Sequence, residues 1–109
     1  MLLMSGERRS NERKQILLEA RWESLSRRHE ARVDDVSLGG CFVNSYAKVE
    51  LGEHIALGIK LPSGEWLSLR GQVASYQHGV GFGMAFTSLS VKETARLKEL
   101  IRTAKERKV

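Results

Sequence analysis

Apolar residues recur at every second position along much of the chain, and this period restricts the local structure more than any other feature. The first run carries them at Ile16, Leu18, Ala20 and Trp22. The charged residues Glu19, Arg21 and Glu23 alternate with them. Successive side chains of a strand point to opposite faces, so a period of two predicts a strand that is buried on one face only. We therefore expect a half-buried strand from residue 15 to about residue 23.

Further short runs with strand character follow, and turn residues separate them. Strands are predicted near residues 31–33, 41–43, 55–61, 66–76 and 80–86, whereas the polar stretch 24–30 is expected to be a connection. Glycine, proline and aspartate mark turns at 34–40, 51–52, 62–64 and 77–79. Gly81 and Gly83 alternate within the last run, which indicates a bend or a close backbone approach of the kind that barrel closure requires.

The last part of the chain changes to helical spacing. Ser90 followed by Glu93 matches a capping box. Apolar residues then recur at Leu97, Leu100, Ile101 and Ala104. Five or six short strands and one C-terminal helix predict a mainly β fold, a small antiparallel β-barrel with the helix as its lid. A length of 109 residues is enough for one such domain and too short for two.

The charge of the chain is unevenly distributed. The net charge is +5, yet residues 33–91 are slightly acidic and both ends are basic. Residues 5–14 contain no apolar side chain and several arginines, so they cannot dock on a core by hydrophobic burial. We expect residues 1–14 to be a flexible arginine-rich arm and residues 15–109 to be the single folded domain. Basic charge near a terminus indicates an anionic partner there.

Several classes of protein are disfavoured. The only cysteine, Cys41, cannot form an intramolecular disulfide, and no apolar run is long enough for a signal peptide or a membrane span, so we expect a cytoplasmic protein. The three histidines are far apart and lack partners at metal-ligand spacing. No nucleophile with an adjacent base and no catalytic carboxylate pair can be assembled. We predict no enzyme activity, metal or cofactor, and we expect Trp22 and Trp66 to pack in or near the core.

Two short motifs are more specific than these general features. Residues 9–13 read R-x-x-x-R, and residues 35–40 read D-x-S-x-x-G at the predicted turn between two strands. Their order, their separation and the predicted barrel resemble the signature of the PilZ domain family. Segments 51–52, 61–62, 69–73 and 81–86 also match the strands and turns of that family. The resemblance implies a six-stranded PilZ-type barrel and a bacterial receptor for the second messenger cyclic di-GMP.

The chemistry of that ligand agrees with an arginine-rich arm. Cyclic di-GMP carries two phosphates and two guanines, and arginine can pair with a phosphate or donate to guanine O6 and N7. Arg9 and Arg13 are therefore the first candidates for ligand contacts. Arg8 directly precedes the motif, and the resemblance implies that an arginine near this place can stack on the ligand or bridge to it.

The turn motif supplies complementary groups. Asp35 can accept hydrogen bonds from the guanine N1 and N2 donors, which no basic side chain can do. Ser37 offers a hydroxyl to a guanine edge or a phosphate. Gly39 and Gly40 leave room for a base to approach the backbone. The same residues also fit an ordinary structural turn, and both roles can hold at once.

We predict that ligand binding is signalled by a change in the conformation of the arm. Ordering a residue costs about 1 to 2 kcal/mol, whereas a charge-assisted hydrogen bond contributes about 1.5 to 3 kcal/mol. Several contacts are therefore needed, and we expect ligand to order residues 5–13 on the barrel. With a single domain, the chain is expected to be an adaptor for an effector protein of motility, secretion or polysaccharide machinery. The alternatives are a PilZ-like scaffold that binds no ligand and, with only 6% aromatic residues to stack on bases, an RNA or single-stranded DNA binder.

Overall fold

The alternating segments form six strands, and one helix follows them. The computed structural model describes residues 17–25 and 27–107, with side chains up to residue 103. The predicted arm and its boundary with the domain lie outside these residues. The strands are β1 (Leu18–Ser24), β2 (Arg27–Asp34), β3 (Gly40–Asn44), β4 (His54–Lys60), β5 (Trp66–Gln77) and β6 (Gly81–Phe86). The helix is α2 (Val91–Arg107).

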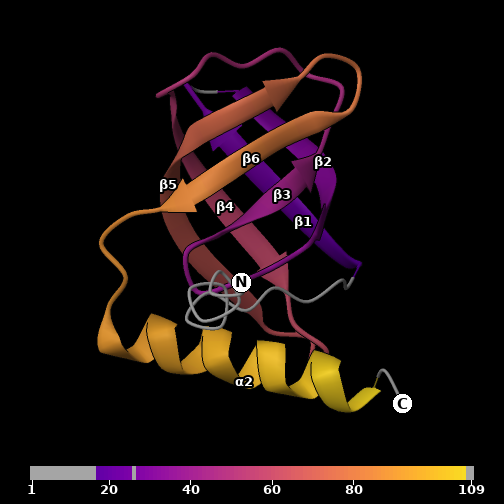
Figure 1. Cartoon of the computed structure of the whole chain (residues 1–109), viewed down its shortest axis with the longest axis vertical. Helices are drawn as coiled ribbons and strands as arrows, with labels where there is room; N and C mark the ends of the chain where they lie inside the picture. The colour runs from indigo at the N-terminus through magenta and orange to yellow at the C-terminus, as the bar shows by residue number, and fades with distance from the viewer. Residues whose placement is uncertain (1–16, 26, 108–109) are drawn as a thin grey trace, which may run out of the picture.

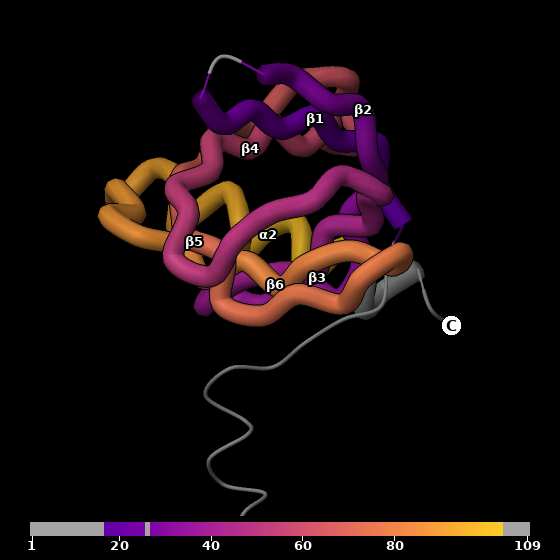
Figure 2. The backbone as a smooth tube through the Cα atoms, turned by 90° about the horizontal axis from the view of Figure 1, so that it is seen from above, coloured from indigo at the N-terminus to yellow at the C-terminus, as the bar shows by residue number. Residues whose placement is uncertain are grey.

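The six strands close into an antiparallel barrel in the order β1-β2-β3-β6-β5-β4. From above, they form a ring through which α2 is visible at the far end (Figure 2). In this ring β3 and β4 lie opposite each other, because three strand steps separate them in either direction. The predicted mainly β fold, a barrel with a C-terminal helix, is thus confirmed.

The apolar side chains at alternate positions of the strands point inward and together form the core of the barrel. Ala20, Leu57 and Phe82 are almost fully buried and come from three different strands. Gly81 explains part of the closure, because a Cβ atom at this position would lie 2.1 Å from the Val43 carbonyl oxygen. The close backbone approach predicted from the glycines is therefore present between β6 and β3.

The helix α2 lies across one end of the barrel (Figure 1). Its capping box forms as predicted: the Ser90 hydroxyl accepts from the Glu93 backbone N–H, and the Glu93 carboxylate accepts from the Ser90 N–H, each at 3.0 Å. Leu97 and Leu100 are buried against the barrel. Within the described residues, no helix is long and apolar enough to cross a membrane.

The sequence prediction was wrong for residues 27–30, which belong to β2 and not to a connection. Strand β1 pairs with β2 along its whole length, and Trp22 lies opposite His29. The imidazole of His29 stacks on the Trp22 indole, with 4.3 Å between the ring centroids. This part of β2 has a histidine where an apolar residue was expected, so hydrophobic periodicity could not identify it.

Glu53 anchors the barrel end that lies away from α2. The Ser24 hydroxyl donates to its carboxylate at 2.5 Å, and the backbone N–H of Glu50 donates at 2.9 Å. These two hydrogen bonds hold the pKa of the Glu53 carboxyl below its ordinary value of 4.5, with the Ser24 bond as the larger cause. The pair thus joins β1 to the loop before β4.

Candidate ligand-binding site

The D-x-S-x-x-G motif forms the turn between β2 and β3, as predicted. Strand β2 ends at Asp34 and β3 begins at Gly40, and the two strands pair with Asp34 opposite Phe42. Asp35 is half-buried and has a φ of 56°. This left-handed conformation is uncommon outside glycine, although aspartate tolerates it better than most residues. The turn therefore fixes the backbone at the first residue of the motif.

Ser37 holds this turn from the inside. Its side chain is 1% exposed. Its hydroxyl accepts from the backbone N–H groups of Gly39 at 3.1 Å and Gly40 at 3.3 Å, and it donates to the Gly40 carbonyl at 3.3 Å. The Ser37 N–H donates to the same carbonyl at 2.9 Å. The hydroxyl that was expected to reach a ligand is thus engaged within the turn.

The two glycines of the motif lie in different surroundings. Gly40 is buried, and a Cβ atom there would lie 2.1 Å from the Met84 carbonyl oxygen. Gly40 therefore allows β3 to approach β6 and does not leave space for a ligand. Gly39 is exposed, and its carbonyl accepts from the Phe86 N–H at 2.9 Å. Gly39 is the glycine whose backbone an outside group can approach.

Comparison with known proteins agrees with the barrel fold. A model of the PilZ domain family matches residues 7–103, which include both motifs and all six strands. The chain belongs to the PilZ domain family. The arm arginines of this PilZ domain fall inside the matched range, but Arg8, Arg9 and Arg13 lie outside the described residues.

Three solved structures share the fold of this PilZ domain. The PilZ domain of Escherichia coli YcgR with c-di-GMP has a TM-score of 0.75 and 15% identity, covering 92% of this chain and 93% of that one. The PilZ domain of CeSA from a cellulose-synthesizing bacterium has a TM-score of 0.69 and 18% identity, and the match covers 86% of this chain and 98% of that one. Bacillus subtilis MotI, an inhibitor of motility, has a TM-score of 0.72 and 15% identity, and the match covers 93% of this chain and 51% of that one.

The chain thus spans about half of MotI and nearly the full length of the other two. At these identities the likeness establishes the fold alone. A comparison with curated protein sequences finds no significant match.

The register of β1 shows where the arm joins the PilZ domain. Leu18 lies opposite Val33, two residues before Asp35. Arg13 precedes Leu18 by five residues, which span at most about 17 Å of extended chain. Covalent geometry therefore allows the arm arginines to reach the D-x-S-x-x-G turn. The sequence alone could not reveal this, because it depends on the pairing of β1 with β2.

The sequence prediction missed polar and aromatic neighbours of the turn. Asn44 donates to the Asp34 carboxylate at 3.4 Å, so the side chains of β2 and β3 meet on the outer face of the barrel. Phe42 is half-buried beside them. These residues carry no motif of their own, and only the register that pairs Asp34 with Phe42 identifies them as neighbours of the site.

Proposed function

We propose that this PilZ domain binds cyclic di-GMP and transmits the bound state to a partner protein. The pairing of Leu18 with Val33 carries the proposal, because it brings the chain that follows the R-x-x-x-R motif to the D-x-S-x-x-G turn. Membership of the PilZ family and the similarity to the YcgR PilZ domain with c-di-GMP support it. The proposed activity is binding, not catalysis.

Each motif residue has a proposed role that follows from its chemistry and surroundings. Arg9 and Arg13 pair with the phosphates and guanine edges, and Arg8 stacks or bridges beside them. Asp35 accepts from guanine N1 and N2.

The role of Ser37 differs from the direct contact expected from the sequence. Because its hydroxyl is buried and engaged, we propose that Ser37 acts as a positioning residue for Asp35 and Gly39. Gly39 is proposed as the point where a base approaches the backbone. Gly40 supports the site by allowing β3 and β6 to pack closely.

The proposed partner is an effector of motility, secretion or polysaccharide machinery. MotI is an inhibitor of motility, and CeSA comes from a cellulose-synthesizing bacterium, so similar folds occur in two of these settings. The ordering of residues 5–13 by ligand is the proposed signal to that partner. A cytoplasmic location for this adaptor also stays a prediction.

Calorimetric titration with cyclic di-GMP and cyclic di-AMP, together with melting curves, tests the proposal. Cyclic di-GMP at about 100 times its dissociation constant should stabilise the fold by about 2.7 kcal/mol. The variants Arg9→Ala, Arg13→Ala and Asp35→Ala should each weaken binding by about tenfold or more, because each removes a charge-assisted hydrogen bond. Arg27→Ala, at an exposed arginine where β2 begins, is the matched control and should bind normally.

Two outcomes would count against the proposal in different ways. No heat and no thermal shift with cyclic di-GMP would favour the scaffold that binds no ligand. Binding that survives both arm substitutions would leave the function in place but remove the assigned site. Binding of a short oligonucleotide in place of the cyclic dinucleotide would favour the alternative of an RNA or single-stranded DNA binder.

A further inference from the structure

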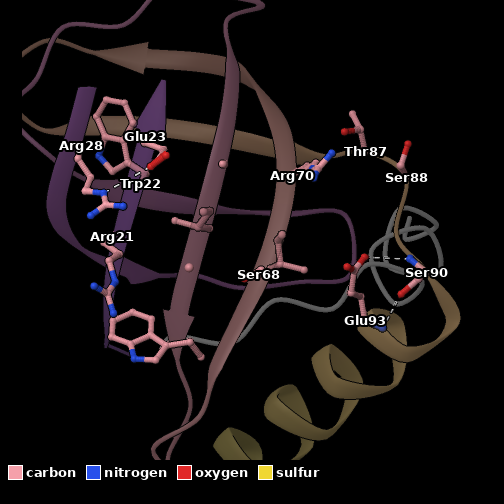
Figure 3. A pocket seen from close by; sticks show the side chains of 15 residues that line it. Arg21, Trp22, Glu23, Arg28, Ser68, Arg70, Thr87, Ser88, Ser90 and Glu93 are labelled. Carbon is pink, nitrogen blue, oxygen red and sulfur yellow. Dashed lines mark hydrogen bonds and ion pairs between the residues drawn. The ribbon is translucent and has the colours of Figure 1, made fainter. Parts of the chain in front are cut away.

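A second polar region lies on the far side of the barrel from β3. The outer faces of β1, β4 and β5 form an open groove of about 730 Å³ that extends to the start of α2 (Figure 3). Its floor is made of small residues. Gly58 of β4 pairs with Ser68 of β5, and Ala56 lies two residues before Gly58, on the same face of β4. Because β4 is opposite β3 in the ring, the groove is separate from the outer surface beside the D-x-S-x-x-G turn.

One wall of the groove is an arginine stacked on a tryptophan. The Arg21 guanidinium carbon lies 3.9 Å from the centroid of the Trp66 indole. A Cβ atom on Gly58 would lie 3.4 Å from Trp66 Cε3 and 3.8 Å from Arg21 Cγ, so both side chains lie over this glycine. Trp66 is therefore half-buried on the outer face of the barrel, whereas Trp22 is in the core. Stacking fixes the guanidinium plane and leaves its N–H edge for a carboxylate.

A second arginine lies on the other flank of the floor. Arg70 is exposed on β5, opposite Ala56 of β4. Figure 3 places Arg70 beside Thr87, across the groove from Arg21. Strands β1 and β5 both flank β4, so their backbones are about 10 Å apart. The groove therefore presents two guanidinium groups on either side of a small-residue floor.

The other charged groups of the groove are already engaged. Arg28 pairs with Glu23 at 3.5 Å, and the Glu93 carboxylate accepts from the Ser90 N–H. In the part of the chain that the structure describes, neither Arg21 nor Arg70 has a carboxylate within ion-pair distance. The groove is lined by three arginines and two glutamates, Glu93 included, so its net charge is +1 and it favours an acidic partner.

We infer that this groove docks an acidic, extended segment of a partner protein. Arginine and tryptophan are enriched where protein interfaces gain most of their binding energy. Successive side chains of an extended chain point to opposite sides, so a segment that lies along the groove directs two acidic side chains three positions apart toward its two flanks. A nucleic acid fits less well, because the Arg21 guanidinium covers the indole on which a base would stack. The position opposite β3 leaves the surface beside the ligand turn free when this segment is bound.

An NMR titration of the ¹⁵N-labelled protein, without cyclic di-GMP, tests this inference. The probe is the capped peptide Gly-Glu-Ala-Ala-Glu-Gly, and its lysine counterpart is the control peptide. The acidic peptide should cause saturable shifts of the Gly58 and Ser68 amides and the Trp66 indole N–H, whereas the Gly39 and Gly40 amides of the β2–β3 turn should not move. Arg21→Gln and Arg70→Gln should each weaken binding about threefold or more. Lys48→Gln, an exposed lysine in the loop between β3 and β4, should have no effect.

The inference fails if the acidic peptide causes no saturable shift, or if the shifts lie outside the groove or persist unchanged in both arginine variants. A 5′-phosphorylated thymidine dinucleotide serves as a further probe. If it moves the groove signals and the acidic peptide does not, the groove binds nucleic acid and the protein segment is ruled out. The titration contains no cyclic di-GMP, so its failure is distinguishable from failure of the proposed receptor function.

Discussion

The β2–β3 turn and the groove on β1, β4 and β5 are assembled in different ways. The turn is built from consecutive residues, and the Ser37 hydroxyl bonds to backbone groups two and three positions later. The groove is built from three strands, and its Arg21 and Trp66 are 45 positions apart in the chain. Buried hydrogen bonds hold the turn, whereas the two arginines of the groove, Arg21 and Arg70, are exposed. Substitutions of the buried turn residues should therefore affect folding, whereas substitutions of the groove arginines should leave folding almost unchanged.

Gly40→Ala should give the largest effect on stability. A Cβ atom would lie 2.1 Å from the Met84 carbonyl oxygen, so β3 and β6 must separate. We expect a loss of about 3 kcal/mol or more in the free energy of unfolding, measured by urea denaturation. Gly39→Ala, at the exposed neighbouring glycine, is the matched control and should cost less than about 1 kcal/mol. Equal losses for the two variants would contradict the close packing at Gly40.

Ser37→Ala should give a smaller loss. The substitution removes a buried hydroxyl that bonds to Gly39 and Gly40, so about 1 to 3 kcal/mol of stability should disappear. Affinity for cyclic di-GMP should also fall, because the turn loses its shape. Ser45→Ala is the control: its hydroxyl accepts only from the Ala47 N–H and it follows β3. An unchanged stability together with a lost affinity would instead indicate a direct contact of Ser37 with the ligand.

The hydrogen bond from Ser24 to Glu53, at the barrel end away from α2, predicts that the stability of the fold depends on pH. The folded pKa of Glu53 is lowered, so this carboxylate stabilises the fold above its unfolded pKa, and the stability is lost as the pH falls through the folded pKa. Ser24→Ala should therefore destabilise the protein more at pH 7 than at pH 3, as measured by urea denaturation. Ser63→Ala, whose hydroxyl accepts only from the Glu65 N–H, should cost the same at both pH values. A constant cost for Ser24→Ala would contradict the assigned cause.

Arg21→Gln should have the smallest effect on stability. It removes an exposed cation–π contact with Trp66, which contributes about 0.5 to 1 kcal/mol. The free energy of unfolding should change by no more than this amount, with Lys48→Gln as the reference. A loss above about 2 kcal/mol would mean that the stacked pair is needed for folding, and it would contradict the expected difference in stability effects between the groove and the turn.

The same contrast explains what the sequence could predict. Alternation and the capping box at Ser90 and Glu93 depend on neighbours in the chain, so the strands and the helix were predictable. The D-x-S-x-x-G turn was predictable for the same reason. The beginning of β2 was missed because His29, which stacks on Trp22, replaces the expected apolar residue. The position of Trp66 on the outer face could not be predicted, because a run of strand residues does not reveal which face closes the barrel.

The engagement of Ser37 was also beyond the sequence. A serine in a turn motif can face a ligand or the backbone, and only the burial of its hydroxyl distinguishes the two. The attachment of the arm beside the turn required the register of β1 and β2. The motif residues could thus be chosen from the sequence, whereas the proposal that some of them contact ligand and others only position the turn needed the structure.

The most direct test of the central claim is an amide chemical-shift map on titration with cyclic di-GMP. We expect saturable shifts of residues 35–40, whose turn adjoins the paired ends of β1 and β2, and no shifts at Gly58 or Ser68 in the groove. Shifts confined to the groove, with residues 35–40 unmoved, would contradict the assignment of the ligand to the D-x-S-x-x-G turn.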